Sequence, residues 1–490
     1  MKCWKLMFPD KDKAGLLFQG REASAAADLR PSTQTHDSAA LPSNDAAAQA
    51  GEQAAKRGSS RVAFGGLFLL TMMLYIRPND LVPGAFEVFQ IVKIVAIFTI
   101  LAYIGSQMSR GNRLTIWPLE MKMLAVILLL AIAFTPVAVS PQTSIETLSD
   151  SFFKVVTIFV LMLNLIDTRA RLRSFMKLLI FCGVFVAASA VLNYFRGATS
   201  LNSAGELVRI AGYGTFFSNP NELAMTVNLI MPFAVVFGLT SKGIKRLAFF
   251  LIAALLAFAV VVSFSRGGFL GLVAIGGVLM WKAGRGRRLV TVLAGLLIAG
   301  AFVVSMPSGY GDRIFTILHN SEDKTNSAQE RQQLLARGLD VIVHHPIIGV
   351  GVGNYGIYSI RQLVAHNSYI EVAAELGLAG FAAYLVLIFA PLRSLRRIER
   401  DTYSRRAAWS ATERETYYIS VGLQAVIISY AVCSFFQSAE YSWYLYYLVA
   451  YTASLRRIHA GEAPSGAAVS DQMSAQPAGD GALWSSARGA

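Results

Sequence analysis

The feature that most constrains this chain is a series of apolar stretches, each about as long as a membrane crossing. A transmembrane helix needs about 20 mostly apolar residues, and 54% of this sequence is hydrophobic while only 15% is charged. Twelve candidate stretches lie near residues 62–76, 88–108, 117–139, 151–166, 174–195, 220–240, 245–263, 267–283, 289–306, 368–391, 417–437 and 440–455. They predict an all-α, polytopic membrane helix bundle of about 12 transmembrane helices.

Lys and Arg gather in alternate connections between these stretches. SRGNR, DTRARLR, SKGIKR, KAGRGRR and RSLRRIERDTYSRRAAWSATERE hold nineteen, whereas RPNDLVPGAFE, SPQTSIETLSD, FSR and QSAEY hold two. Because Lys and Arg favour the cytoplasmic side, this asymmetry predicts that both termini are cytoplasmic. It also explains the net charge of +14, so we expect no nucleic-acid partner.

Five regions follow from this pattern. We expect a disordered cytoplasmic tail at 1–60, transmembrane helices one to nine at 61–306, an outer loop at 307–367, helices ten to twelve at 368–458 and a second disordered cytoplasmic tail at 459–490. The polar segment 196–219 falls on the same outer side as the long loop. Polar residues therefore collect on one face, and we expect the chemistry there.

Within the long loop, SAQERQQLLARGLDVIVHHP has the pattern of an amphipathic helix. Ser327 and Glu330 have capping-box spacing, and Pro346 would end the helix. Its apolar stripe consists of Leu335, Leu339, Ile342 and Val343. The helix could lie along the membrane surface or simply pack on the bundle. The following GVGVGNYG lacks the flanking strand of a dinucleotide loop, so we expect a tight turn or a close backbone approach.

Two arginines are candidate anion ligands. Arg266 lies in SFSRGG, between two apolar stretches, so it is placed at the membrane boundary. A guanidinium pairs bidentately with phosphate, although an interfacial arginine can also extend toward lipid headgroups. Arg209 lies in the shorter outer segment, upstream of SNPNELA.

SNPNELA predicts a helix start at Pro220. Asn219 can be the N-cap or a ligand, and Asn221 lies in the first turn, where free N–H groups can receive an anion. Glu222 can be a base or an ordinary first-turn acid.

His344, His345 and His366 raise the question of a metal, but their spacing fits no common ligand set. The three cysteines form no pair in an extramembrane loop, so we expect neither a disulfide nor a metal site. A loop histidine is more often structural than catalytic, and His366 on its own is a weak candidate.

Charged side chains also enter the helix that follows His366 and Asn367. Ser368 and Glu371 have capping-box spacing. Glu375 lies about two turns into the predicted helix, where an ionisable group is a functional candidate or the partner of an arginine.

Four motifs occur in order along the chain: FFSNPNELA, SRGG, HHPIIGVGVGNY and HNSYIEVAAELGLAG. In this order they resemble the O-antigen ligase and polymerase superfamily, over roughly residues 200–395. The resemblance implies a multi-pass protein of the bacterial cell inner membrane whose long loop is periplasmic. It implies a glycosyltransferase that moves a glycan from undecaprenyl pyrophosphate to an acceptor at the periplasmic face, without a metal or cofactor. The acceptor would be lipid A core, a growing polysaccharide or protein, and membrane lipids would surround the bundle.

By motif, Arg266 and His366 carry over as catalytic residues, while Arg209 and Arg331 are looser matches. The arginines would neutralise the pyrophosphate, and His366 or Glu222 would take the acceptor proton. Asn219, Asn221, Glu222 and Glu375 complete the candidate substrate-binding set. A single displacement would invert the anomeric centre.

Other functions stay open. A polymerase has the same motifs as a ligase. A transporter or flippase of lipid-linked glycan would share the spans and the arginines but would leave the glycosidic bond intact. A non-catalytic assembly partner would change the amount of polysaccharide without changing its linkage.

Overall fold

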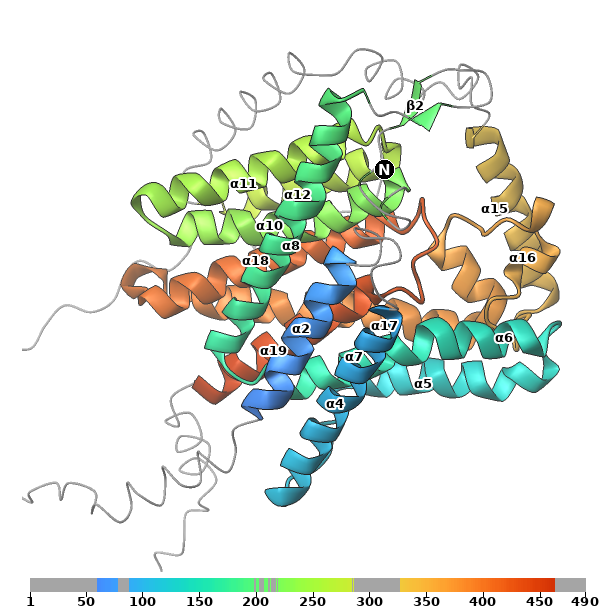
Figure 1. Ribbon diagram of the computed structural model, residues 1–490, viewed down its shortest axis with the longest axis horizontal. Helices are drawn as coiled ribbons and strands as arrows, with labels where there is room; N and C mark the ends of the chain where they lie inside the picture. Colours follow the sequence, from blue (N-terminus) through green and yellow to red (C-terminus); the bar gives the residue numbers. More distant parts are fainter. Residues whose placement is uncertain are drawn as a thin grey trace, which may run out of the picture. The chain divides into compact units, whose positions relative to one another are not determined.

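A computed structural model describes residues 60–77, 88–197, 200–201, 207–209, 212, 217, 219–283, 285 and 327–462 of the chain. Its helices are α2 (Arg61–Ile76), α4 (Val88–Ser109), α5 (Leu119–Phe134), α6 (Pro141–Thr147), α7 (Phe153–Leu165), α8 (Arg169–Phe195), α10 (Pro220–Thr240), α11 (Gly243–Val262), α12 (Arg266–Ala283), α15 (Ser327–His344), α16 (Tyr355–Tyr358), α17 (Ser368–Ser404), α18 (Ala411–Cys433) and α19 (Trp443–Glu462). Short turns are η1 (Thr135–Val137), η2 (Leu148–Phe152), η4 (Ile360–Gln362) and η5 (Arg406–Ala408), and β1 (Ser200–Leu201) pairs antiparallel with β2 (Leu207–Arg209). Most long helices run side by side, with α15 and α16 at one end (Figure 1).

The prediction of an all-α polytopic membrane protein is confirmed. Among the described residues, eight helical segments are long and apolar enough to cross a membrane. These are Ile91–Ser109, Leu119–Val137, Pro141–Leu165, Arg169–Phe195, Pro220–Thr240, Gly243–Val262, Ser368–Ser404 and Ala411–Cys433. The predicted stretches at 62–76 and 267–283 are also helical, within α2 and α12, and the stretch at 440–455 is helical from Trp443, where α19 begins. The stretch at 289–306, residues 1–59 and 463–490 of the two predicted tails, and residues 307–326 of the long loop lie outside the described residues.

The fourth predicted span is longer than its apolar stretch. The polar SPQTSIETLSD was expected to be a connection, but Pro141–Thr147 forms α6, and a π-helical turn joins it to α7. The Ser140 hydroxyl accepts the backbone N–H of Thr143 and caps α6, with Pro141 at the first helical position. The capping residue and the proline together start a helix that apolarity alone did not indicate.

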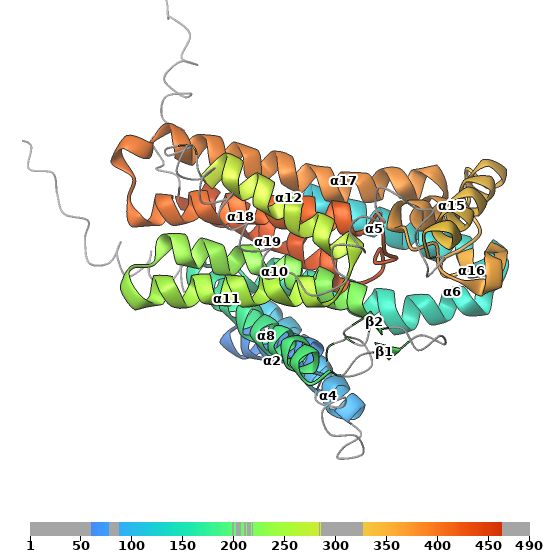
Figure 2. The same cartoon turned by 90° about the horizontal axis from the view of Figure 1, so that it is seen from above.

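Helices α10 and α18 lie at the centre of the bundle, while α4 lies at its rim. The most apolar windows of α10 and α18 are 83% and 78% buried, against 17% for that of α4. Small residues allow close helix approach: a Cβ on Gly268 would meet Ala224 of α10, and one on Gly422 would meet Val236. Helices α10 and α18 run alongside α12 and α19 in the second view as well (Figure 2).

We call the end of the bundle where α10, α12 and α17 begin the site end. At the opposite end, buried charges are paired between helices. Lys282 of α12 donates to Glu399 of α17, and Glu399 also accepts from Gln424 of α18 at 3.0 Å. Arg456 of α19 donates to Glu120 of α5 at 2.6 Å. Paired charges of this kind hold helices in register, because removing one partner leaves an uncompensated buried charge.

Helix α17 is broken near its start. Gly377 has φ 65° and ψ −174°, a conformation that essentially only glycine adopts. The break frees carbonyl groups of the preceding turn. Two of them accept hydrogen bonds from GVGVGNYG, residues 349–356, which we call the glycine-rich loop. Val350 N–H donates to Ala374 O at 2.9 Å and Gly351 N–H donates to Glu375 O at 3.0 Å. The turns of α17 that precede Gly377 are therefore set off from the rest of the helix and are hydrogen-bonded to the long loop.

Candidate functional site

A cavity of about 290 Å³ lies at the site end, between the starts of α12 and α17, the first turns of α15, and the connection from α18 to α19 (residues 434–442). We call it the arginine–histidine cavity. Its lining consists of Arg266, Leu270, Arg331, Gln332, Leu335, Ala365, His366, Asn367, Phe435 and Phe436. Three predicted site residues, from segments far apart in the sequence, therefore border one space. All three are half-buried.

Arg266 is the first residue of α12, and the start of α10 fixes the turn before it. The Ser265 hydroxyl donates to the Asn221 side chain at 2.7 Å and accepts the Gly268 N–H at 3.2 Å. The Asn228 amide donates to Gly268 O at 2.8 Å. The small residues of SRGG are therefore needed for contact with α10, and that contact places the arginine at the cavity.

His366 is held in a strained backbone conformation. Its φ of 50° is in the left-handed region, which is uncommon for a residue other than glycine. Asn367 caps α17, and its side chain accepts the N–H groups of Tyr369 and Ile370 at 3.0 and 3.2 Å. The capping role expected for Ser368 and Glu371 is therefore wrong, because Asn367 already accepts those first-turn donors. Strain at a cavity residue is typical of functional sites.

Ser368 and Glu371 instead bind the 434–442 connection. Ser368 N–H donates to Ser434 O at 2.9 Å, and its hydroxyl donates to Gln437 O at 2.8 Å. The same hydroxyl accepts Ala439 N–H at 2.8 Å. Ser438 donates to the Glu371 carboxylate. These bonds attach the start of α17, with His366 next to it, to the segment that carries Phe435 and Phe436.

Arg331 lies in the second turn of α15, and this helix packs on α17. The Tyr355 hydroxyl donates to Leu334 O at 2.7 Å, and a Cβ on Gly338 would meet Ile370 of α17. Leu334 and Val341 are buried, whereas Leu339 is 50% and Val343 74% exposed. The predicted helix is confirmed. The side chains of its predicted apolar stripe have different surroundings, because Leu335 lines the cavity whereas Leu339 and Val343 are exposed.

A comparison with known protein families finds a match over part of this chain. Residues 251–385 match the family model described as O-Antigen ligase. The resemblance to that superfamily is confirmed over this segment. The match begins in α11, covers α12, α15 and α16, and ends within α17, so it includes Arg266, Arg331 and His366. No curated protein matches the chain.

Asn219, Asn221 and Glu222 of the SNPNE motif lie outside the cavity lining, and Asn221 contacts the turn that precedes Arg266. Asn219 caps α10 by accepting Asn221 N–H at 2.9 Å, so the predicted helix start is confirmed. Glu222 accepts the Tyr444 hydroxyl at 2.7 Å. Arg209 ends β2, and its side chain lies outside the described residues.

Glu375 is buried and is hydrogen-bonded to two other segments of the site end. Its carboxylate accepts Tyr355 N–H at 3.1 Å and the Tyr441 hydroxyl at 2.8 Å. The break at Gly377 is two residues further along the chain, and the glycine-rich loop is hydrogen-bonded to the backbone of Glu375 itself. Glu375 is therefore surrounded by protein. The two alternatives for Glu375 were a functional role and pairing with an arginine; the hydrogen-bond partners of its carboxylate include a backbone amide and a tyrosine hydroxyl.

Sequence reasoning missed the 434–442 connection, because the predicted spans 417–437 and 440–455 left only two residues between them. Glu440 of this connection is 5% exposed, and burial, followed by the charge of Glu375, raises the pKa of its carboxyl to about 8. Its neighbour Tyr441 has a raised pKa, with burial as the main cause. The available signal was FFQSAEY itself, since a carboxylate and a phenol between two apolar helices need partners. Among the described residues, no group of three or more His, Cys, Asp or Glu could hold a metal ion.

Proposed function

We propose that this chain is an O-antigen ligase-like glycosyltransferase that takes its glycan from undecaprenyl pyrophosphate at the periplasmic face of the bacterial inner membrane. One observation carries the proposal: Arg266, Arg331 and His366, from three separate helices or their flanking loops, line a single cavity at the site end. Two guanidinium groups and an imidazole suit a reaction in which a pyrophosphate leaves and a hydroxyl attacks.

In the proposed reaction, the acceptor hydroxyl oxygen bonds to the anomeric carbon as the bond from that carbon to the pyrophosphate oxygen breaks. The His366 imidazole takes the hydroxyl proton, and the electron pair of the broken bond stays on the pyrophosphate. Arg266 and Arg331 stabilise the charge that develops there, which is the kind of electrostatic contribution with the largest catalytic effect. The anomeric configuration inverts because one displacement occurs.

The positions of the aromatic side chains support a glycan-sized substrate at this cavity. Phe435 is 51% exposed and Phe436 lies beside it in the lining, so apolar ring faces border the polar groups. A sugar ring stacks on such faces, while the arginines hold the phosphates. The cavity therefore offers separate surfaces for the two parts of the donor.

The test is a transfer assay with the full chain in proteoliposomes, supplied with lipid-pyrophosphate-linked glycan and a hydroxyl acceptor. Release of undecaprenyl pyrophosphate that depends on the acceptor supports a glycosyltransferase. Translocation of intact donor without release would contradict it and would favour a flippase.

The acceptor is tested in cells that lack the gene. Free, uncoupled polymer in those cells indicates a ligase, which is the function we propose. Single capped units indicate a polymerase, and less polysaccharide with unchanged linkage indicates an assembly partner.

A further inference from the structure

His366 is the turn residue between the long loop and α17, and both of its neighbours in the chain are fixed. Ala365 and Asn367 are buried, and both line the arginine–histidine cavity. A residue with φ of 50° keeps this conformation only where the surrounding structure holds it. The position of the imidazole therefore depends on the groups that bind Ala365 and Asn367.

Glu371 of α17 binds both of these neighbours. Its backbone N–H donates to Asn367 O at 3.1 Å, in the first turn of the helix. Its side-chain carboxylate accepts a hydrogen bond from the backbone N–H of Ala365. One residue thus closes the turn on either side of His366.

The same carboxylate also binds the 434–442 connection. The Ser438 hydroxyl donates to it, and this connection carries Phe435 and Phe436 of the cavity lining. A carboxylate has two oxygens with about four acceptor sites, so it can accept both donors. Glu371 is 5% exposed, so water competes little for these bonds. The carboxylate therefore joins the histidine turn to the segment that carries the aromatic side chains.

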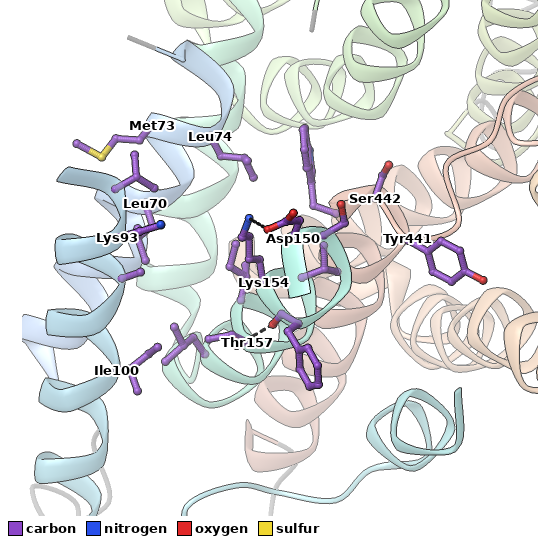
Figure 3. A pocket seen from close by; sticks show the side chains of 18 of the residues that line it. Leu70, Met73, Leu74, Lys93, Ile100, Asp150, Lys154, Thr157, Tyr441 and Ser442 are labelled. Carbon is purple, nitrogen blue, oxygen red and sulfur yellow. Dashed lines mark hydrogen bonds and ion pairs between the residues drawn. The ribbon is translucent and has the colours of Figure 1, made fainter. Parts of the chain in front are cut away.

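Two other residues of α17 hold the 434–442 connection in a different way. The Ser368 hydroxyl bonds to the backbone of Gln437 and Ala439. At the far end of the connection, the Tyr441 ring points away from Lys154 of the neighbouring groove between α2, α4 and α7 (Figure 3), and its hydroxyl donates to Glu375. These contacts attach the connection to α17, whereas the Glu371 carboxylate also reaches the chain in front of His366.

We propose that Glu371 is a positioning residue for His366, which keeps the imidazole and the aromatic side chains of the 434–442 connection facing the same substrate. This inference rests on the proposed transfer reaction, in which the imidazole takes the proton of the acceptor hydroxyl. Because a reacting group that is misplaced by about 1 Å can cost about 10²-fold in rate, loss of the Glu371 carboxylate is expected to reduce the rate through His366.

The first experiment compares two substitutions of similar size in the proteoliposome transfer assay. Glu371→Met removes the acceptor oxygens without opening a cavity, and we expect kcat to fall by about 10²-fold. Glu371→Gln keeps one carbonyl oxygen and is expected to recover at least half of this loss on a logarithmic scale. Glu120→Gln changes a buried carboxylate at the opposite end of the bundle and is expected to keep the wild-type kcat. Equal rates for Glu371→Met and the wild type would overturn the proposal.

A double-mutant cycle separates positioning from a general effect on the fold. In a His366→Asn background the imidazole is absent, so Glu371→Met is expected to lower the residual rate by less than about twofold. The same fold loss in both backgrounds would overturn the proposal, because Glu371 would then act on transfer without His366. If Glu371→Met does not fold, Ser438→Ala takes its place in the cycle. It removes one donor to the carboxylate and is expected to lower kcat by about fivefold when His366 is present, and an unchanged rate would overturn the proposal.

A measurement without substrate distinguishes failure of this inference from failure of the proposed function. The full chain is labelled with ¹³Cε1-histidine and studied by NMR in detergent, where the His366 signal is the one that His366→Asn lacks. Glu371→Met is expected to shift or broaden this signal, whereas Glu120→Gln is expected to leave it unchanged. An unchanged His366 signal in folded Glu371→Met would overturn the positioning role alone. A wild type that transfers no glycan would contradict the proposed function and, with it, any role of Glu371 in transfer.

Discussion

The Tyr355 N–H donates a hydrogen bond of 3.1 Å to the Glu375 carboxylate, which lies 20 residues further along the chain. The same carboxylate accepts the Tyr441 hydroxyl at 2.8 Å. Glu375 therefore joins the glycine-rich loop, the first turns of α17 and the 434–442 connection. The 434–442 connection carries two residues of the arginine–histidine cavity, Phe435 and Phe436, and α17 begins directly after two more, His366 and Asn367. A carboxylate with these contacts supports the geometry of the site.

Replacing Glu375 tests this junction. Glu375→Ala leaves a buried amide and a buried hydroxyl without an acceptor, and we expect a loss of about 2–4 kcal/mol in the free energy of unfolding. Glu375→Gln keeps one carbonyl oxygen and should lose less than half of that. Thermal unfolding in detergent measures both. Glu330→Ala is the control, because its pair with Arg361 is long at 3.8 Å and exposed. An alanine variant as stable as that control would contradict a role for Glu375 in holding the site end together.

Gly377 provides a second test of the same region. A Cβ there would meet the Ile347 carbonyl, and φ 65° with ψ −174° is unfavourable for any other residue. We expect Gly377→Ala to cost more than the 1–3 kcal/mol typical of such strain and to reduce transfer, since the loop must move away from α17. Gly277→Ala on α12 is the matched control: nothing lies within 4 Å of its added Cβ, so its stability should stay equal or rise by up to about 1 kcal/mol. Equal melting temperatures for the two variants would contradict the backbone contact at Gly377.

The helices were largely predictable from sequence because apolar length and charge asymmetry are local signals. The starts of α10, α15 and α17 were predicted to within a residue from SNPNE, SAQE and HNSYIE, since capping chemistry is local too. Helix α6 was not predicted, because SPQTSIETLSD is polar. It is helical through the Ser140 cap and through a hydrogen bond of 2.9 Å from Ser144 to Val352 O, 208 residues away.

The residues of the candidate site were predictable by type but not by contact. Arg266 and His366 were candidates from their motifs, and their shared cavity depends on how α12, α15 and α17 pack, which no local pattern specifies. Glu375 shows the limit most clearly. Its position two turns into an apolar helix indicated a charge within the membrane, whereas the Gly377 break and the loop amide of Tyr355 surround it with protein. The break lies at a glycine within an otherwise helical sequence pattern.

Arg266 is expected to act through both its charge and its shape. Arg266→Ala should lower kcat for transfer by about 10²–10³ through loss of one charge-stabilising donor. Arg266→Lys should recover part of this, since an ammonium supplies the charge without the bidentate geometry. The measurement is the rate at which undecaprenyl pyrophosphate is released in proteoliposomes. Arg361→Ala, which removes an exposed cation of the long loop, should retain the wild-type rate. A rate above half of wild type for Arg266→Ala would remove the arginine from the mechanism.

Glu440 is expected to make stability depend on pH. Its pKa is raised to about 8 in the folded protein from an ordinary value of 4.5. Between these values the folded state binds more protons than the unfolded state, so stability is fully present below about pH 4.5 and falls as the pH rises toward 8. We expect Glu440→Gln to remove this fall: the variant should melt above the wild type at pH 8.5, with a smaller difference at pH 5.5. Glu146→Gln, on an exposed carboxylate, should follow the wild type. If the melting temperatures of the wild type and Glu440→Gln change with pH in parallel, Glu440 does not titrate between pH 5.5 and 8.5.

His366 is the residue whose chemical role is most open to test, because a base and a structural histidine respond differently to pH. A general base must be neutral to accept the acceptor proton, so wild-type kcat should fall toward acid pH. His366→Gln should lower kcat by about 10²–10⁴ and remove this acid limb. The φ of 50° at this position favours Asn as a second variant, since Asn tolerates the left-handed region. His366→Asn should therefore keep the wild-type melting temperature and still lose the rate. His344→Gln, on an exposed histidine that contacts Asp340, is the control and should retain both the rate and the pH profile. If kcat of a folded His366→Asn variant still falls toward acid pH as in the wild type, another group takes the acceptor proton. Glu222 would then be the next residue to replace.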